Sequence, residues 1–231
     1  MGYAWILFDA DGTLFDFDSA QRGAVEATFR DCGAAYDPGY ERIYARANEQ
    51  TWLEFERGEI SQQELRTRRF ERMFEEIGLD ADPQPYSERF LLNLATNVDL
   101  LDGAEQLLED LHGSVRMLLI TNGLAEVQRP RLSRSSIARY FEHVVISGEV
   151  GHAKPHPAIF EHAFECMGQP DKSEGLIVGD SLTSDIRGGC NYGIDTCWFN
   201  PDGIERPDHA ADLDIRHEVR SLDEIVRIAR A

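Results

Sequence analysis

Residues 3–14 read YAWILFDADGTL, and this stretch decides the fold. The run Trp5–Phe8 is apolar on both faces, which is typical of a buried central strand in a parallel sheet. It ends at Asp9 and Asp11, so two carboxylates follow directly on that strand. Open α/β sheets bind their ligands at the carboxyl ends of the strands. Because buried acids need a cation or donors to compensate them, we expect a ligand site here. A plain acidic turn is the alternative.

The composition restricts the class of partner. The chain has 231 residues, of which 42% are hydrophobic and 10% aromatic, as in a globular protein with a sizeable core. A formal net charge of -19 repels polyanions, so we expect no nucleic-acid polymer as partner. A small phosphorylated molecule remains compatible with this charge, because one bound metal ion can reverse the local field.

The cysteines and the apolar runs indicate the compartment. The spacing of the cysteines matches neither a CxxC pair nor a zinc site, so we interpret Cys32, Cys166, Cys190 and Cys197 as reduced, packed thiols. No apolar run approaches the roughly 20 residues that cross a bilayer, and no signal-peptide pattern opens the chain. We therefore expect no membrane association and a cytoplasmic location.

Helical patterns fill the interval from Phe15 to Asn97, which contains no convincing strand. The expected helices are residues 20–32, 39–57 after an Asp37-Pro38 start, 62–77 after a capping box at Ser61, and about 83–97. This pattern predicts an all-helical insertion, residues 16–97, within a core formed by residues 1–15 and 98–231.

From Asp102 onward, helices and strands alternate. The expected strands are residues 115–120, 143–146, 175–178, 195–199 and 211–215, and the expected helices are 104–111, one after Gly123, 157–167, 184–192 and a terminal one capped by Ser221 and Glu224. This alternation predicts βαβ units and a doubly wound parallel sheet, an α/β fold. Pro130 lies inside the helix expected after Gly123 and should kink or delay it.

Polar residues of catalytic type also follow the later strands. They are Thr121 and Asn122 after residues 115–120, Lys154 after residues 143–146, and Asp180 and Asp185 after residues 175–178. A hydroxyl, a carboxamide and main-chain amides beside a helix start suit phosphate oxygens. Taken singly, each residue has a purely structural explanation: a strand-to-helix turn, a solvated lysine or a helix cap.

Their convergence is more informative, because all carboxyl ends of a parallel sheet share one edge. Four aspartates and one lysine should therefore meet there. Oxygen ligands of this kind favour Mg²⁺, which usually keeps water molecules and binds a substrate phosphate. The sequence thus predicts metal-assisted phosphoryl transfer.

These residues resemble, in order, the four motifs of the haloacid dehalogenase superfamily. The motifs are residues 9–14, Thr121, Lys154 and residues 179–185, and the helical insertion takes the position of that superfamily's cap. The resemblance implies catalytic roles for Asp9 as the nucleophile that forms an aspartyl phosphate and for Asp11 as the general acid and base. It further implies a Mg²⁺ site made by Asp9, the Asp11 carbonyl and Asp180, phosphate binding by Thr121, Asn122 and Lys154, and an orienting role for Asp185.

Asp11 separates the activities within the superfamily, because the dehalogenating members have no acid at that position. Within the superfamily, the chain is similar to bacterial pyrimidine 5'-nucleotidases at residues 8–11, 14–15, 17–19, 120–123, 145–147, 149–151, 153–155 and 196–198. The resemblance implies a nucleoside monophosphate as the substrate. A sugar-phosphate phosphatase, a phosphomutase, a 2-haloacid dehalogenase and an inactive phosphometabolite sensor remain as alternatives.

Aromatic residues of the helical insertion are candidates for contact with a base. Trp52 and Phe55 lie on an expected helix, and Phe17 lies in the connector before it. Each could stack on a base, although aromatic side chains more often pack between helices. We expect the insertion to decide specificity, since the core motifs recognise only phosphate.

Overall fold

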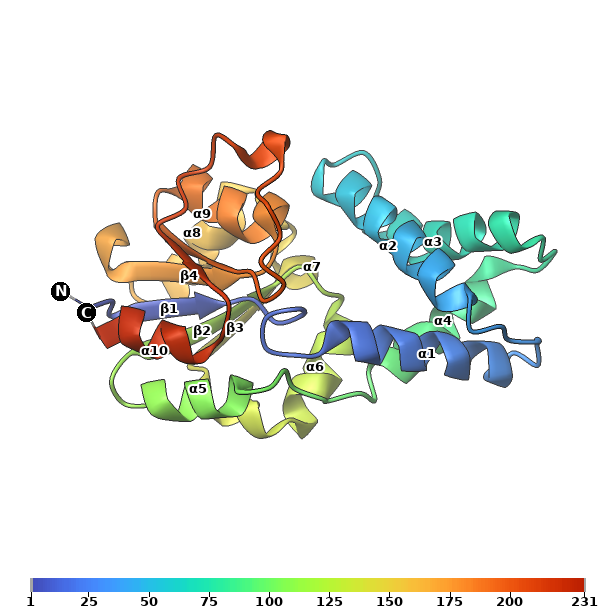
Figure 1. Cartoon of the computed structure of the whole chain (residues 1–231), viewed down its shortest axis with the longest axis horizontal. Coiled ribbons are helices and arrows are strands. Elements are labelled where there is room, and N and C mark those ends of the chain that lie inside the picture. Colours follow the sequence, from blue (N-terminus) through green and yellow to red (C-terminus); the bar gives the residue numbers. More distant parts are fainter. Residues whose placement is uncertain (1, 231) are drawn as a thin grey trace. The chain divides into compact units, whose positions relative to one another are not determined.

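The computed structural model describes residues 2–230, which form two compact units (Figure 1). The α/β unit contains the residues up to Asp16, Leu100–Ala125 and the chain from Leu132 onward. The helical unit contains Phe17–Asp99 together with Glu126–Arg131. These last six residues belong to helix α6 (Ala125–Arg134), which the expected division placed in the core and which continues through Pro130.

The α/β unit is built on a parallel sheet of six strands, in the order β3-β2-β1-β4-β5-β6. The strands are β1 (Trp5–Phe8), β2 (Arg116–Thr121), β3 (His143–Ile146), β4 (Gly175–Gly179), β5 (Asp195–Phe199) and β6 (His217–Val219). The chain winds outward from β1 to one edge through β2 and β3, and then to the other edge through β4. The strand order therefore reverses around β1, which is where doubly wound sheets bind ligands.

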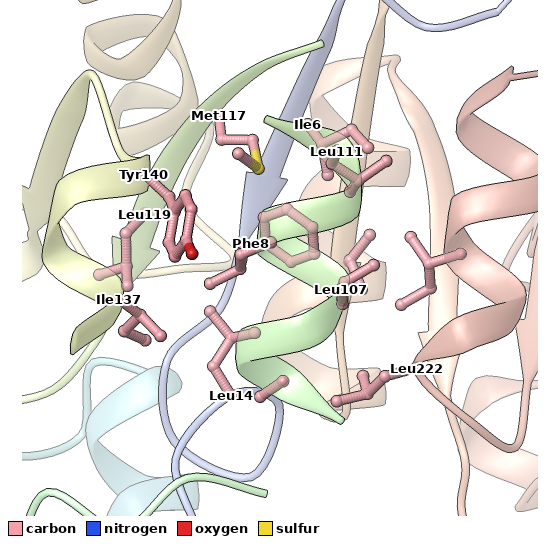
Figure 2. Close-up of a cluster of buried hydrophobic side chains, with 14 of the residues drawn as sticks. Ile6, Phe8, Leu14, Leu107, Leu111, Met117, Leu119, Ile137, Tyr140 and Leu222 are labelled. Carbon is pink, nitrogen blue, oxygen red and sulfur yellow. The ribbon is translucent and has the colours of Figure 1, made fainter. Parts of the chain in front are cut away.

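The alternation of side chains along β1 explains why all four of its residues are apolar. Ile6 and Phe8 point into one core cluster and Trp5 and Leu7 into another, so both faces of the strand are buried. Figure 2 shows the cluster around Phe8. The predicted buried central strand is confirmed.

Helices cover both faces of the sheet, with α5 and α10 on one side and α8 and α9 on the other (Figure 1). The helices and turns of this unit are α5 (Ala104–Leu111), η1 (Ser136–Tyr140), α7 (Ser147–Val150), α8 (Pro157–Cys166), η2 (Lys172–Glu174), η3 (Leu182–Ile186), α9 (Arg187–Tyr192), η4 (Asp208–Ala210) and α10 (Asp223–Arg230). The predicted α/β class and doubly wound sheet are confirmed.

The strand predicted at residues 211–215 is wrong, because β6 lies at His217–Val219. Leu213 and Ile215 alternate as in a strand, but they pack in a small cluster with Trp198 instead of joining the sheet. The hydroxyl of Thr196 donates to the Asp214 carbonyl at 3.0 Å, which satisfies one main-chain group without a strand partner. Packing and side-chain hydrogen bonds, which also come from Cys190 to Asp214 and from Arg206 to Leu213, therefore replace a ladder at this point.

The helical unit contains α1 (Phe17–Asp31), α2 (Tyr40–Glu56), α3 (Gln62–Ile77) and α4 (Pro83–Leu94). The capping box between Ser61 and Glu64 starts α3 as predicted, and the left-handed Gly78 ends it. Asp37 accepts from the Gly39 amide at 2.7 Å, but α2 begins at Tyr40 without a side-chain cap. Trp52 and Phe55 are half-buried and pack edge to face, with ring centroids 5.7 Å apart.

None of the helices within residues 2–230 is long and apolar enough to cross a membrane.

Candidate active site

Asp9 lies directly beyond β1, at the point where the strand order reverses. Its amide donates to the Val178 carbonyl at 2.9 Å, so the β1–β4 pairing continues one residue past Phe8. The chain then turns sharply, because the amides of Leu14 and Phe15 both donate to the Ala10 carbonyl, at 2.9 and 2.8 Å. The sheet therefore fixes the backbone of Asp9, and only 7% of the residue is exposed.

Lys154 connects Asp9 to two other parts of the sheet edge. Its ammonium Nζ donates to Asp9 Oδ1 at 2.5 Å, to Asp185 Oδ1 at 2.7 Å and to the Ile120 carbonyl at 2.9 Å. An ammonium has three N–H donors, so all of them are used. Only 1% of Lys154 is exposed. Burial by itself would lower the pKa of Lys154, but Asp185 and Asp9 outweigh it and hold the pKa above its ordinary value.

The surroundings of Asp9, the candidate nucleophile, shift its pKa in opposite directions. Burial raises the pKa of Asp9 well above its ordinary value. The charge of Lys154 opposes this shift, whereas the charges of Asp185 and Asp180 add to it. The ammonium therefore compensates only part of the negative charge collected at this edge.

Asp185 has both carboxylate oxygens engaged by the protein. Oδ1 accepts from Lys154, and Oδ2 accepts from the Ser181 amide at 3.1 Å. Asp185 lies in η3, a π-helical turn, a conformation that often marks functional positions. Gly179 lies against this carboxylate, where a Cβ atom would collide with Asp185. These contacts place Asp185 as a partner of Lys154.

Asp180 is held by residues from two other strand ends. The Thr13 hydroxyl donates to Asp180 Oδ1 at 3.2 Å and accepts from the Asp180 amide at 3.1 Å. The indole of Trp198 donates to the Asp180 carbonyl at 3.0 Å. Although Asp180 as a residue is exposed, reduced hydration of its carboxylate and then the charge of Asp185 raise its pKa to about 7.

Gly12 leaves the space that the Asp180 carboxylate occupies. Its φ is +85°, and a Cβ atom built there would lie 2.5 Å from Asp180 Oδ2. Any side chain at this position would therefore displace Asp180, in addition to straining the backbone. The glycine thus serves both the turn after Asp9 and the position of the carboxylate.

Carboxylate oxygens of Asp9, Asp180 and Asp185 come within 4.8 Å of one another. Their three formal negative charges face the single positive charge of Lys154, so the cluster has an excess of negative charge. Oxygen donors with excess negative charge fit a hard divalent cation. The Asp11 side chain is not in this group; it lies half-buried in the turn after Asp9.

Thr121 is the last residue of β2, and Asn122 follows it. The Thr121 hydroxyl accepts from the Gly123 amide at 3.0 Å and keeps its own hydrogen for donation. Both ends of the Asn122 carboxamide pair with the main chain of Lys154, at 2.7 and 2.8 Å, a contact that the sequence did not predict. The carboxamide therefore faces Lys154.

The structure thus joins Asp9, Lys154 and Asp185 by direct contacts and brings Asp180 to the same cluster. Sequence reasoning missed the residues that hold these groups, namely Thr13, Ser181 and Trp198. Thr13 was visible in the stretch after Gly12, and Trp198 near the end of an expected strand. Their partners, however, lie 167 and 18 residues away along the chain.

A parallel α/β sheet with an acidic cluster and a buried lysine at its switch point defines a class of hydrolases. The model of the haloacid dehalogenase-like hydrolase family matches residues 3–193. The chain belongs to this family, and within it to the phosphatases.

Individual relatives cover nearly the whole chain. Pyrimidine 5'-nucleotidase YjjG of Escherichia coli (strain K12) is 38% identical over 211 residues, which are 91% of this chain and 92% of that protein. Pyrimidine 5'-nucleotidase PynA of Streptococcus pneumoniae (strain ATCC BAA-255 / R6) is 36% identical over 206 residues, 89% of this chain and 87% of that protein. The crystal structure of the HAD-hydrolase YfnB from Bacillus subtilis bound to magnesium matches with a TM-score of 0.93 at 31% identity, covering 100% of both chains.

Proposed function

We propose that this phosphatase hydrolyses nucleoside 5'-monophosphates, preferably those of pyrimidines, with Mg²⁺ and through a phosphorylated Asp9. The observation that carries the mechanism is the buried contact of Asp9 with Lys154 beside two further carboxylates. The substrate class is supported by the likeness to two pyrimidine 5'-nucleotidases.

Asp9 is the nucleophile of this mechanism. One of its carboxylate oxygens attacks phosphorus, forming an acyl phosphate while the bond from phosphorus to the ester oxygen breaks. Asp11, half-buried in the turn that follows, gives its proton to the leaving ester oxygen. Asp11 then accepts a proton from water as that water attacks phosphorus, which releases phosphate and restores Asp9.

Lys154 must exchange a partner when phosphate arrives. All three of its N–H donors are used by Asp9, Asp185 and Ile120, so an added contact to phosphate requires one of these bonds to break. We assign the released bond to Asp9, because bonding of one carboxylate oxygen to phosphorus removes the negative charge that attracts the ammonium. The ammonium passes from the nucleophile to the phosphate and stabilises the charge that develops there.

The donor set of the cluster fits Mg²⁺, held by Asp9 and Asp180 together with the main-chain carbonyl of Asp11. Bound there, Mg²⁺ would supply positive charge to the phosphate oxygens and offset the repulsion among the carboxylates. Asp185 has both oxygens engaged and serves to orient Lys154. Thr121 donates its hydroxyl hydrogen to a phosphate oxygen.

We assign the choice of substrate to the helical unit, since the residues described above recognise only a phosphate ester and a cation. We interpret this unit as the family's cap. Trp52 and Phe55 are half-buried as residues, and we assign them as candidates for stacking on a base.

The test is release of phosphate from a panel of nucleoside monophosphates and sugar phosphates, with Mg²⁺ and with a chelator. We expect deoxyuridine and thymidine monophosphates to be the best substrates, and the chelator to stop their hydrolysis. If sugar phosphates are hydrolysed best with the same metal dependence, the substrate class is wrong and the core mechanism stands. If phosphate is transferred to a second hydroxyl of the substrate, the protein is a mutase.

A further inference from the structure

Asn122 forms a reciprocal pair of hydrogen bonds with one residue 32 positions along the chain. Its Oδ1 accepts from the Lys154 amide at 2.7 Å, and its Nδ2 donates to the Lys154 carbonyl at 2.8 Å. A main-chain amide can only donate and a carbonyl can only accept, so the orientation of the carboxamide is unambiguous. The Asn122 side chain thus pairs with the Lys154 main chain through one donor and one acceptor, as a neighbouring strand would.

This arrangement fixes the Asn122 carboxamide against the main chain of Lys154. Only 9% of Asn122 is exposed, and each end of its amide group already has a partner. Nδ2 keeps one further N–H, so a contact of this side chain with phosphate would add to the pair with Lys154 and would not replace it. The sequence expectation that this carboxamide binds phosphate stays a prediction, and the pair with Lys154 gives the side chain a second role.

Asn122 is itself anchored from a third element. The Ser147 hydroxyl, at the start of α7, donates to the Asn122 carbonyl at 3.1 Å. The end of β2 is thereby joined to α7 and to the connection between α7 and α8 that carries Lys154. Connections of this kind are usually the more mobile parts of a fold, so an active-site lysine placed on one needs an anchor for its backbone.

We propose that Asn122 is a positioning residue, which holds the main chain of Lys154 so that its ammonium reaches both Asp9 and Asp185. This inference rests on the proposed function, because it assigns to Lys154 a part in phosphoryl transfer. Displacing a catalytic group by about 1 Å can lower the rate about 100-fold. The variant N122A should accordingly lower kcat by about 10- to 100-fold and leave KM nearly unchanged.

Asn200 provides a matched control. It is buried, and it makes the same reciprocal pair with the main chain of Ile204, 3.0 Å on each side. Asn200 has no contact with Lys154 among the hydrogen bonds described for residues 2–230. Because Nδ2 of Asn200 also donates to Glu218 at 2.8 Å, the variant N200A should lower the unfolding temperature at least as much as N122A does, without the loss of kcat.

A double-mutant cycle with p-nitrophenyl phosphate and Mg²⁺ decides how Asn122 acts. In the background of K154M, the added change N122A should lower kcat by less than twofold, since the group it positions is gone. Independent losses that multiply in the double variant would overturn the proposal and point to direct contact with phosphate.

Hydrogen exchange gives a readout that does not depend on catalysis. The Lys154 amide should be protected in the wild-type protein and lose that protection in N122A, whereas N200A should leave it unchanged. Unaltered exchange of this amide in N122A would overturn the positioning role. If the wild-type protein releases phosphate from no ester, the proposed function fails. The exchange result still decides whether Asn122 holds the main chain of Lys154.

Discussion

The Nζ atom of Lys154 lies 2.5 Å from Oδ1 of Asp9, joining two buried residues that are 145 positions apart in the chain. With Asp185 at 2.7 Å on the other side, the lysine stands between two carboxylates. Removing one partner of a buried ion pair leaves an uncompensated charge in a poorly solvated place. The contact therefore links the stability of this sheet edge to its chemistry.

The variant K154M should be strongly destabilised in the absence of metal. It leaves Asp9 and Asp185 buried without their cation, and such losses cost about 3–5 kcal/mol of the free energy of unfolding. Mg²⁺ should recover part of this loss. Chemical denaturation with and without Mg²⁺ measures both quantities. Lys172, whose ammonium lies at the surface near the Tyr192 carbonyl, provides the control K172M, and an equal loss in the two variants would contradict the argument.

The variant D9N should lose at least about 10⁴-fold in kcat, as expected when a covalent nucleophile is removed. Its fold should persist, because asparagine keeps the shape of the side chain. It also removes a carboxylate whose charged form burial disfavours, as the raised pKa of Asp9 indicates. Phosphate release and the unfolding temperature are the measurements. D18N changes an exposed aspartate of α1 in the same way and should retain activity. Turnover by D9N within tenfold of wild type would refute the phosphoenzyme.

The variant D11N separates the two halves of the reaction. A nitrophenolate leaves without a proton, so D11N should still transfer phosphate from p-nitrophenyl phosphate to Asp9 and then stall, because no base activates water. A rapid-mixing experiment should show a burst of nitrophenolate of about one equivalent per enzyme. With a nucleotide, whose leaving oxygen needs the proton, no burst should occur. Steady turnover of both substrates at wild-type rates would exclude the role of Asp11 as acid and base.

Gly12 offers a test of the position of Asp180. The variants G12A and G113A both place alanine at a positive φ, +85° and +79°, and should share a backbone strain of about 1–3 kcal/mol. Only at Gly12 would the added Cβ atom meet Asp180; at Gly113 nothing lies within 4 Å. We expect G12A alone to weaken the apparent affinity for Mg²⁺ and to lower kcat. If the two variants change the Mg²⁺ dependence equally, backbone strain causes the change and displacement of Asp180 does not.

The raised pKa of Asp180 predicts how pH affects the metal-free protein. Its pKa is 3.8 ordinarily and about 7 when folded, so between these values the native state holds a proton that the unfolded state has lost. The contribution of Asp180 to stability therefore falls as pH rises from about 4 to 7. Binding of Mg²⁺ to the ionised form should raise the unfolding temperature more at pH 8 than at pH 5.5.

The variant D180N lacks this titration and serves as the reference for that pH series. The difference in unfolding temperature between the metal-free wild type and D180N should shift in favour of D180N as pH rises across this interval. A difference that stays constant from pH 5.5 to pH 8 would show that Asp180 does not titrate there.

Much of the fold could be predicted because local patterns carry it. The apolar run Trp5–Phe8 indicated a strand buried on both faces, and the capping box at Ser61 marked the start of α3. β3 and β5 occupy the predicted residues. In each case the signal lies within a few residues, since burial pattern, cap and turn are local properties.

The error at residues 211–215 shows where local patterns end. Leu213 and Ile215 alternate with polar residues as in a strand, but both side chains pack in the cluster that contains Trp198. Pairing with β5 fell instead to His217–Val219. Which segment joins a sheet depends on its neighbours in space, so the alternation alone could not decide it.

The sequence by itself determined which chemical groups lie at which strand ends: Asp9 after the first strand, Thr121 and Asn122 at the end of the second, and Asp180 after the fourth. The rule that parallel strands end at one edge was enough to expect these groups together. Only the tertiary structure decided how each group is used. It turned the Asn122 carboxamide toward the backbone of Lys154 and engaged both oxygens of Asp185. The physical reason is that a hydrogen bond forms only when the donor–acceptor distance is correct to within a few tenths of an ångström. For residues far apart in the chain, packing sets that distance and local sequence does not.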